Sequence, residues 1–383
     1  MSMSPPCPAT LADTVREFTP NWFTVTMGTG ALALALNQLP FAHPALHGLG
    51  RSLWAANIVL FATFTLLYAL RWICFFEGAR RIVHHPVMSM FFGAVPMGLA
   101  TIVNGFLAFG SDWMSADTAV AIARTLWWGD AALSVLCSVL VPYWMFTRQA
   151  HSLEKMTAVW LLPIVASEVA AASAGLLVPH LPPAEAFPVL MLGYVLWACS
   201  VPLALSILVV LVLRLILHKL PDRDMGPSAW LALGPIGTGA LALLLLGEDA
   251  RPVLAARGLA GVGDVAFGVG VIGATLLCGY GAWWLTVAGL KTVRYLREGM
   301  AFNLGWWGFT FPLAVYALAT LALARITQFA LFDVAGTVLV AGLAGFWAVV
   351  ATRTAQGAAD RRLFFAPCLH APAQRVQLQA DAV

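Results

Sequence analysis

Two acidic residues stand in the middle of long apolar stretches, where a charge is costly. Asp130 lies in TLWWGDAALSVLCSVL (125–140) and Glu168 lies in WLLPIVASEVAAASAG (160–175). A bare charge at the centre of a bilayer costs about 2.5–3.5 kcal/mol or more, and neither acid has an obvious basic partner at similar depth. Burial and mutual repulsion favour one shared or two bound protons near neutrality. The two acids therefore predict either the proton-coupling groups of a transporter or neutral groups that join two helices by hydrogen bonds.

Uncharged hydrogen-bond donors recur in the segments that are richest in small residues. They are Thr29, Ser89, Thr101, Asn104, Thr238 and Thr310. Lys and Arg are missing from the middle of these segments, so an anion there would depend on such dipoles and on backbone N–H groups. Weak, distributed dipoles suit fast passage, because a tight cationic site would hold the anion. The alternative is that each hydroxyl bonds only to a carbonyl of its own helix.

A basic cluster precedes the third apolar stretch. Arg80, Arg81, His84 and His85 lie within six residues. Adjacent histidines chelate one ion poorly and no Cys or carboxylate cluster follows, so we expect no metal site. The cluster instead predicts a helix cap and a mouth that enriches anions electrostatically.

Sequence signatures of catalysis are missing. The chain contains no HExxH, GxSxG, CxxC or Walker-type loop. An enzyme would have to use the two deep acids and the histidine pair, which lie at different depths. We therefore expect neither an enzyme nor a cofactor.

The composition sets the class of protein that must position these groups. Apolar residues make up 61% of the 383 residues and charged residues 10%, and the mean hydropathy is +0.84. A soluble domain has about 45–50% apolar and about 25% charged residues. The apolar stretches suit helices rather than barrel strands, so the sequence predicts an all-α integral membrane protein.

Ten membrane-spanning helices are expected. Their approximate bounds are 21–39, 53–75, 88–109, 117–146, 157–178, 186–215, 228–247, 264–289, 303–324 and 331–352. This divides the chain into a cytoplasmic N-terminal segment (1–20), a transmembrane domain (21–353) and a cytoplasmic tail (354–383). The chain opens on MSMSPPCPATLADTVREF, which does not resemble a cleavable signal peptide.

The positions of the cations predict the orientation. With both termini in the cytoplasm, five of the 21 Lys and Arg residues fall outside: Arg51, Arg124, Arg251, Arg257 and Arg325. This is a positive-inside pattern for a protein of the plasma (inner) membrane. The net charge of +3 thus reflects topology and gives no reason to expect nucleic acid as a partner. All six cysteines fall in spans or on the cytoplasmic side, so we expect no disulfides.

Odd and even spans differ in composition. The odd spans begin about 67–75 residues apart, which is the period of a two-helix hairpin. They are rich in small residues, and four carry a proline: Pro96, Pro163, Pro235 and Pro312. A proline within a membrane helix frees a carbonyl that protein or water must satisfy. Five hairpins around a central pore, with the odd helices inside, therefore fit the sequence.

One decamer occurs twice in the odd spans. MGTGALALAL occupies 27–36 and IGTGALALLL occupies 236–245, with eight of ten positions identical. These copies and the third span supply the glycines expected to line the path: Gly28, Gly30, Gly98, Gly237 and Gly239. The alternative is that such glycines only allow helices to pack closely.

Three longer stretches are more specific. They are HHPVMSMFFGAVPMGLATIVNG (84–105), WLLPIVASEVAAASAG (160–175) and FNLGWWGFTFPLAVYALAT (302–320). With the two GTG segments, they resemble the tellurite-resistance/dicarboxylate transporter family, and most closely its sulfite-pump and malate-permease branch. Slow anion channels of plants are more distant members.

The resemblance implies an anion path between five inner helices, often in a homotrimer. It also implies that a phenylalanine on the ninth helix plugs the path. Phe311, directly before Pro312, is the first candidate and Phe309 the second. The expected solute is a small anion, with sulfite and a C4-dicarboxylate such as malate both open. Proton-coupled transport and an uncoupled gated channel also both stay open.

Overall fold

The computed structural model describes residues 10–41 and 43–365, and this part of the chain is helical without β-strands. The helices are α1 (Leu11–Glu17), α2 (Phe23–Asn37), α3 (Pro44–Cys74), α4 (Phe76–Arg80), α5 (Ala94–Phe109), α6 (Ala116–Thr147), α7 (Leu162–Leu177), α8 (Pro183–His218), α9 (Leu233–Ala255), α10 (Ala260–Arg297), α11 (Phe311–Thr327) and α12 (Ala330–Ala359). Short 3-10 segments precede or follow several of them: η1 (Pro20–Trp22), η2 (Arg81–His84), η3 (Met88–Gly93), η4 (Gly110–Asp112), η5 (Ala158–Leu161), η6 (Val178–His180), η7 (Arg223–Ala232), η8 (Leu304–Phe309) and η9 (Arg362–Phe364).

Nine helical segments of the described chain are long and apolar enough to cross a membrane. They correspond to the second to tenth spans expected from the sequence. The first expected span is α2, whose 15 residues follow the short segment η1. The described structure therefore establishes a multi-helix membrane architecture with nine clear candidate spans.

Burial divides these segments into two classes. In the segments that contain α5, α7, α9 and α11, between 61% and 94% of the most apolar stretch is buried. In α3, α6, α8, α10 and α12 the buried share is only 17% to 33%. Nearly all of α2 is buried as well. The small-residue helices are thus inside and the bulky ones outside, as the composition predicted.

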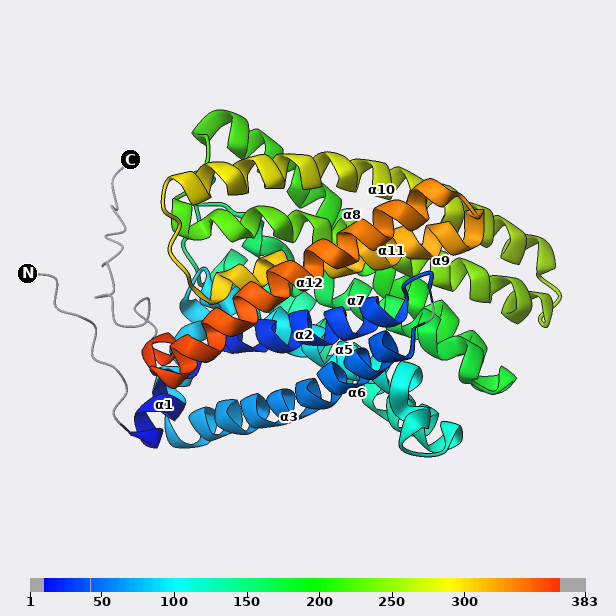
Figure 1. Cartoon of the computed structure of the whole chain (residues 1–383), viewed down its shortest axis with the longest axis horizontal. Helices are drawn as coiled ribbons and strands as arrows, with labels where there is room; N and C mark the ends of the chain where they lie inside the picture. The colour runs from blue at the N-terminus through cyan, green and yellow to red at the C-terminus, as the bar shows by residue number, and fades with distance from the viewer. Residues whose placement is uncertain (1–9, 42, 366–383) are drawn as a thin grey trace, which may run out of the picture.

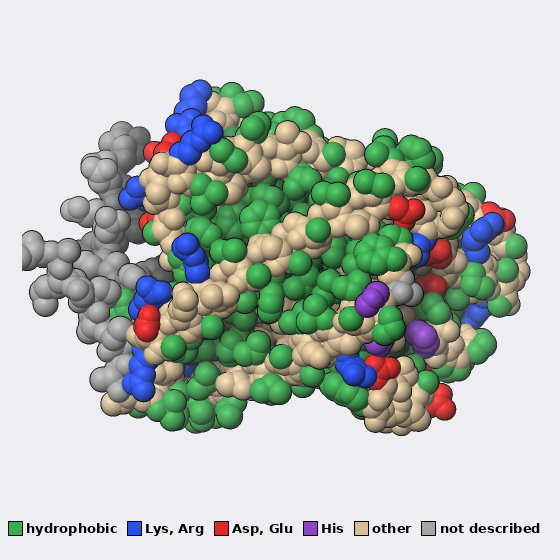
Figure 2. All heavy atoms as spheres, in the orientation of Figure 1, with side chains coloured by type: hydrophobic (Ala, Val, Ile, Leu, Met, Phe, Trp, Pro, Cys, Tyr) green, Lys and Arg blue, Asp and Glu red, His purple; other side chains and the backbone are tan. Residues whose placement is uncertain are grey.

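The inner helices contact one another in a closed order. Helix α2 contacts α5, α5 contacts α7, α7 contacts α9, α9 contacts α11, and α11 returns to α2. Figure 1 shows α3, α10 and α12 lying along the outside of this group. Figure 2 shows an apolar surface over the middle of the molecule, with Lys and Arg gathered at the end that carries α1. Such a surface suits a lipid environment.

The prolines correct one expectation. Pro96, Pro163, Pro235 and Pro312 lie in the first turns of α5, α7, α9 and α11, each after a 3-10 segment. The N–H groups of a first turn have no partner within the helix, so a proline there removes no α-helical hydrogen bond. These four inner spans therefore change from 3-10 to α geometry near the proline, and the expectation that these prolines lie within the helices and free a carbonyl there is wrong.

Candidate functional site

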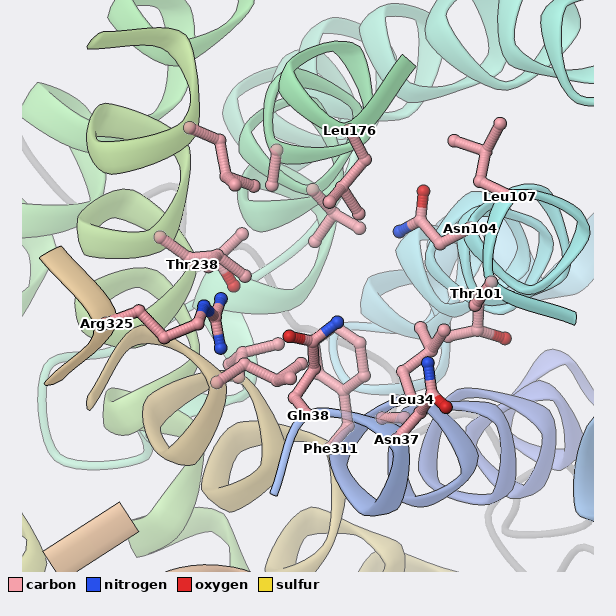
Figure 3. A pocket seen from close by; sticks show the side chains of 18 of the residues that line it. Leu34, Asn37, Gln38, Thr101, Asn104, Leu107, Leu176, Thr238, Phe311 and Arg325 are labelled. Carbon is pink, nitrogen blue, oxygen red and sulfur yellow. The ribbon is translucent and has the colours of Figure 1, made fainter. Parts of the chain in front are cut away.

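A cavity of about 350 Å³ lies between the inner helices and reaches the C-terminal ends of α2 and α11, and we name it the distal cavity. It is lined from all five of α2, α5, α7, α9 and α11 (Figure 3). The polar residues in its wall are Asn37, Gln38, Thr101, Asn104, His180, Thr238 and Arg325. The rest of the wall is apolar, so the few polar groups must determine what the cavity accepts.

A second cavity of about 430 Å³ lies among the N-terminal turns of the same helices and the 3-10 segments before them. We name it the proximal cavity, because its lining residue Asn21 follows α1 closely in the chain. Its polar wall consists of Asn21, Thr24, Asp224, Ser228 and Asn303, and no Lys or Arg is among its lining residues. The first residues of α7 and α11, Leu162 and Phe311, belong to its wall.

Phe311 belongs to the wall of both cavities. Its side chain is 4% exposed, and it begins α11 directly after the 3-10 segment η8. Pro312 lines the proximal cavity beside it. Phe311 is therefore a lining residue that the two cavities share.

Phe309 has different surroundings from Phe311. Its ring stacks on Phe346 of α12 at 5.2 Å between centroids, and it meets Trp230 and Trp306 edge-on, each at 5.6 Å. It lines neither cavity. Phe309 is thus part of an aromatic cluster between inner and outer helices, and Phe311 alone of the two gate candidates faces the cavities.

The uncharged donors fall into two groups. Thr101, Asn104 and Thr238 line the distal cavity. Thr29 instead accepts a hydrogen bond from Trp347 Nε1 of α12 at 3.1 Å. The two copies of GTGALAL are therefore not equivalent, because the threonine of the first copy faces an outer helix.

Ser89 and Thr310 also lie outside the two cavities. Ser89 Oγ accepts from Gln149 Nε2 at 3.0 Å, and Thr310 Oγ1 donates to the carbonyl of Trp307 at 2.7 Å. Thr310 thus bonds to a carbonyl of its own segment, as the alternative interpretation of the hydroxyls required, and so does Thr101, whose hydroxyl donates to the carbonyl of Gly98 at 2.7 Å. Ser89 instead bonds to a side chain of another segment.

The five glycines serve close packing. A Cβ on Gly28 would lie 2.2 Å from Thr310 Oγ1, and one on Gly237 would lie 2.5 Å from the backbone N of Tyr316. Gly30, Gly98 and Gly239 likewise face other helices and line neither cavity. Pro96, Pro163 and Pro235 are buried and line neither cavity either. These residues shape the path by bringing its helices together.

The two buried acids lie in seams between helices. Glu168 Oε2 accepts a hydrogen bond from Ser200 Oγ of α8 at 3.2 Å, and its other oxygen has no partner in the described chain. Asp130 on α6 is fully buried, and neither of its oxygens has such a partner. Neither acid lines either cavity. Any effect on a solute in the cavities must therefore pass through the packing of α6, α7 and α8.

The basic cluster directly precedes the 3-10 segment η3 in the chain. His85 Nδ1 accepts the N–H groups of Val87 and Met88 at 3.2 and 3.1 Å, which caps the segment as expected. Burial lowers the pKa of His85, and this agrees with a neutral ring whose Nδ1 is an acceptor. Arg80 pairs with Glu77 at 3.0 Å on the surface. Arg81 and His84 are exposed, and no cluster of metal ligands occurs in the described residues.

Sequence reasoning missed four polar lining residues of the distal cavity: Asn37, Gln38, His180 and Arg325. Arg325 enters the sequence analysis only as a cation on the minor side of the positive-inside pattern. All four lie at or next to the ends of helical segments. The available signal was Arg325 itself, an arginine at the end of an inner span where cations are otherwise rare.

Comparison with known proteins agrees with this architecture. The sequence pattern of the voltage-dependent anion channel family matches residues 17–355. A sulfite efflux pump of Arthroderma otae is 37% identical over 353 residues, covering 91% of this chain and 93% of the pump. A malic acid transport protein of Schizosaccharomyces pombe is 22% identical over 339 residues, covering 86% and 76%. An uncharacterized transporter of Methanocaldococcus jannaschii is 28% identical over 343 residues, covering 89% and 94%.

These matches confirm the resemblance found in the sequence, and the names of the relatives describe transporters or channels rather than enzymes. The apolar helices make the chain a multi-pass membrane protein. The chain belongs to the voltage-dependent anion channel family and is a membrane protein for the transport of anions.

Proposed function

We propose that this protein conducts a small anion, sulfite or a C4-dicarboxylate such as malate, along the axis of its inner helices, with Phe311 as the gate. The observation that carries the proposal is that one residue, Phe311, belongs to the walls of both cavities. Displacement of its ring would join the cavities. Thr101, Asn104 and Thr238 would then line one continuous path on the distal side.

The electrostatics of the helix ends support an anion as the solute. The first turns of α2, α7 and α11 reach the proximal cavity through Thr24, Leu162 and Phe311. The N-terminus of a helix carries a partial positive charge, which stabilises an anion without a basic side chain, and the acidic side chain of Asp224 in the same wall opposes this effect. The names of the relatives, a sulfite efflux pump and a malic acid transport protein, support the two solutes.

The proposal includes the full architecture. Helix α2, preceded by η1, is the first of ten spans, so that five hairpins surround the pore and both termini face the cytoplasm of the plasma membrane. The contact order of the inner helices and the Lys and Arg residues at the α1 end support this topology. A homotrimer is the proposed assembly. Measurement of the mass of the purified protein in detergent tests it.

Flux through purified protein in liposomes tests the proposed transport. Sulfite and malate uptake are measured side by side for the wild type and for Phe311→Ala. We expect uptake of one of these anions, and faster uptake in the variant. Folded protein that passes neither anion, with or without the Phe311 ring, would refute the proposal.

Proton coupling is a second candidate, and the buried carboxyl of Glu168 favours it. This group lies between α7 and α8 with one oxygen unpartnered in the described chain, and α7 contributes Val169 and Ala172 to the distal cavity. A change in the protonation of Glu168 would alter the packing between α7 and α8 and, through α7, the wall of the distal cavity. The test is uptake under an imposed pH gradient for wild type, Glu168→Gln and Asp130→Asn. Equal gradient dependence in all three proteins would exclude coupling through these acids.

A further inference from the structure

The wall of the distal cavity includes one arginine, whereas the lining residues of the proximal cavity include no Lys or Arg. Arg325 lies in the last turn of α11, and its guanidinium points into the cavity in Figure 3. No hydrogen bond or ion pair joins this guanidinium to a residue of the described ranges 10–41 and 43–365. The carboxylates of Glu248 and Asp333 act on it electrostatically from α9 and α12 but form no salt bridge with it. Its five N–H donors therefore face the cavity or solvent.

Unpartnered polar atoms lie across the same cavity. Thr238 is 1% exposed, and its hydroxyl has no hydrogen-bond partner in the described chain. Asn104 is 9% exposed, and its side-chain carbonyl is unpartnered as well. Figure 3 shows Thr238, Asn104 and Gln38 around the space that the Arg325 guanidinium enters. A buried polar group without a partner is costly, so the Thr238 hydroxyl is expected to donate to something inside the cavity. The Asn104 carbonyl oxygen is an acceptor, and only the N–H groups of its side-chain amide can donate to an anion.

We infer that the distal cavity is a binding site for an oxyanion, held by Arg325 with the Thr238 hydroxyl and the side-chain amides of Asn104 and Gln38. The planar guanidinium matches a group that presents two oxygens, such as a carboxylate or sulfite, better than it matches chloride. Amide N–H and hydroxyl groups supply the remaining donors to the anion. The inference rests on the proposed function for the identity of the anion, because transported sulfite or malate would occupy this site.

The position of the site makes the path asymmetric. An anion in the proximal cavity meets the acidic side chain of Asp224 and no basic side chain, whereas in the distal cavity it meets Arg325. Phe311 belongs to the walls of both cavities, so the arginine lies on one side only of the proposed gate.

Equilibrium binding to purified, detergent-solubilised protein tests the site independently of transport. Sulfite, malate and chloride are titrated calorimetrically into the wild type, Arg325→Gln, Arg325→Lys and Thr238→Val. The matched control is Arg257→Gln, because Arg257 is exposed and contacts the ring of Phe187 without lining the cavity. Melting temperatures verify that every variant is folded.

We expect the wild type to bind sulfite or malate more tightly than chloride, and Arg325→Gln to weaken that binding about tenfold or more. Arg325→Lys should reduce the preference over chloride, Thr238→Val should weaken binding several-fold, and Arg257→Gln should bind as the wild type does. Folded wild type that binds neither oxyanion at about 10 mM would overturn the inference, as would Arg325→Gln with unchanged affinity. Binding as expected without any liposome flux would retain the site and refute the proposed transport instead.

Discussion

The two gate candidates allow one prediction that separates a plug from a packing residue. Phe311 has cavities on two sides, whereas Phe309 is enclosed by Trp230, Trp306 and Phe346. Replacing a fully packed phenylalanine with alanine costs about 3–5 kcal/mol of unfolding free energy. We expect that loss for Phe309→Ala. For Phe311→Ala we expect about half, ~2 kcal/mol, because part of its ring already faces empty space.

The flux should change in the opposite order. If displacement of the Phe311 ring costs the wild type about 2 kcal/mol, its removal should raise anion flux about 30-fold, since 1.4 kcal/mol corresponds to a factor of ten. Phe309→Ala leaves the ring of Phe311 in place and should leave the flux of folded protein near that of the wild type.

Liposome uptake per folded protein and thermal melts of the same samples measure both quantities. The combination expected is a large gain in flux with a small loss of stability for Phe311→Ala, and the reverse for Phe309→Ala. Equal gains in flux for the two variants, or no gain for Phe311→Ala, would refute the assignment of the gate from the cavity walls.

Two further variants test other parts of the fold. A Cβ on Gly237 would lie 2.5 Å from the backbone N of Tyr316, so Gly237→Ala should destabilise the protein by about 1–3 kcal/mol. Gly234 has open space around it, so Gly234→Ala should not destabilise the protein, and thermal melts compare the two variants. Burial lowers the pKa of His85, so below the ordinary histidine pKa the unfolded chain binds more protons than the folded chain. The stability that the neutral His85 ring contributes is therefore complete above about pH 6.5 and decreases as the pH falls further. His85→Asn keeps a capping oxygen without this titration, so its melting temperature should fall less between pH 7 and pH 5 than that of the wild type, and identical pH profiles would contradict this role.

The sequence alone was sufficient to predict an all-α membrane protein, the alternation of inner and outer helices, and the family. Apolar runs of membrane length and the contrast between small and bulky spans are local properties of composition, and the long motifs carry the family resemblance directly. The preference for Phe311 over Phe309 as the gate stays a prediction, which rests on the resemblance and on the adjacent Pro312. These conclusions require no knowledge of how one helix faces another.

The tertiary structure decided which side chains face the path. Each residue along a helix turns its side chain by about 100°, so the packing of neighbouring helices determines whether a given group meets a cavity or a seam. Thr238 lines the distal cavity, whereas Thr29, in the same decamer, bonds to Trp347. The same rotation places Glu168 against Ser200 and leaves Arg325 directed into the cavity. Composition and spacing leave that rotation open, because it depends on contacts between segments that are far apart in the chain.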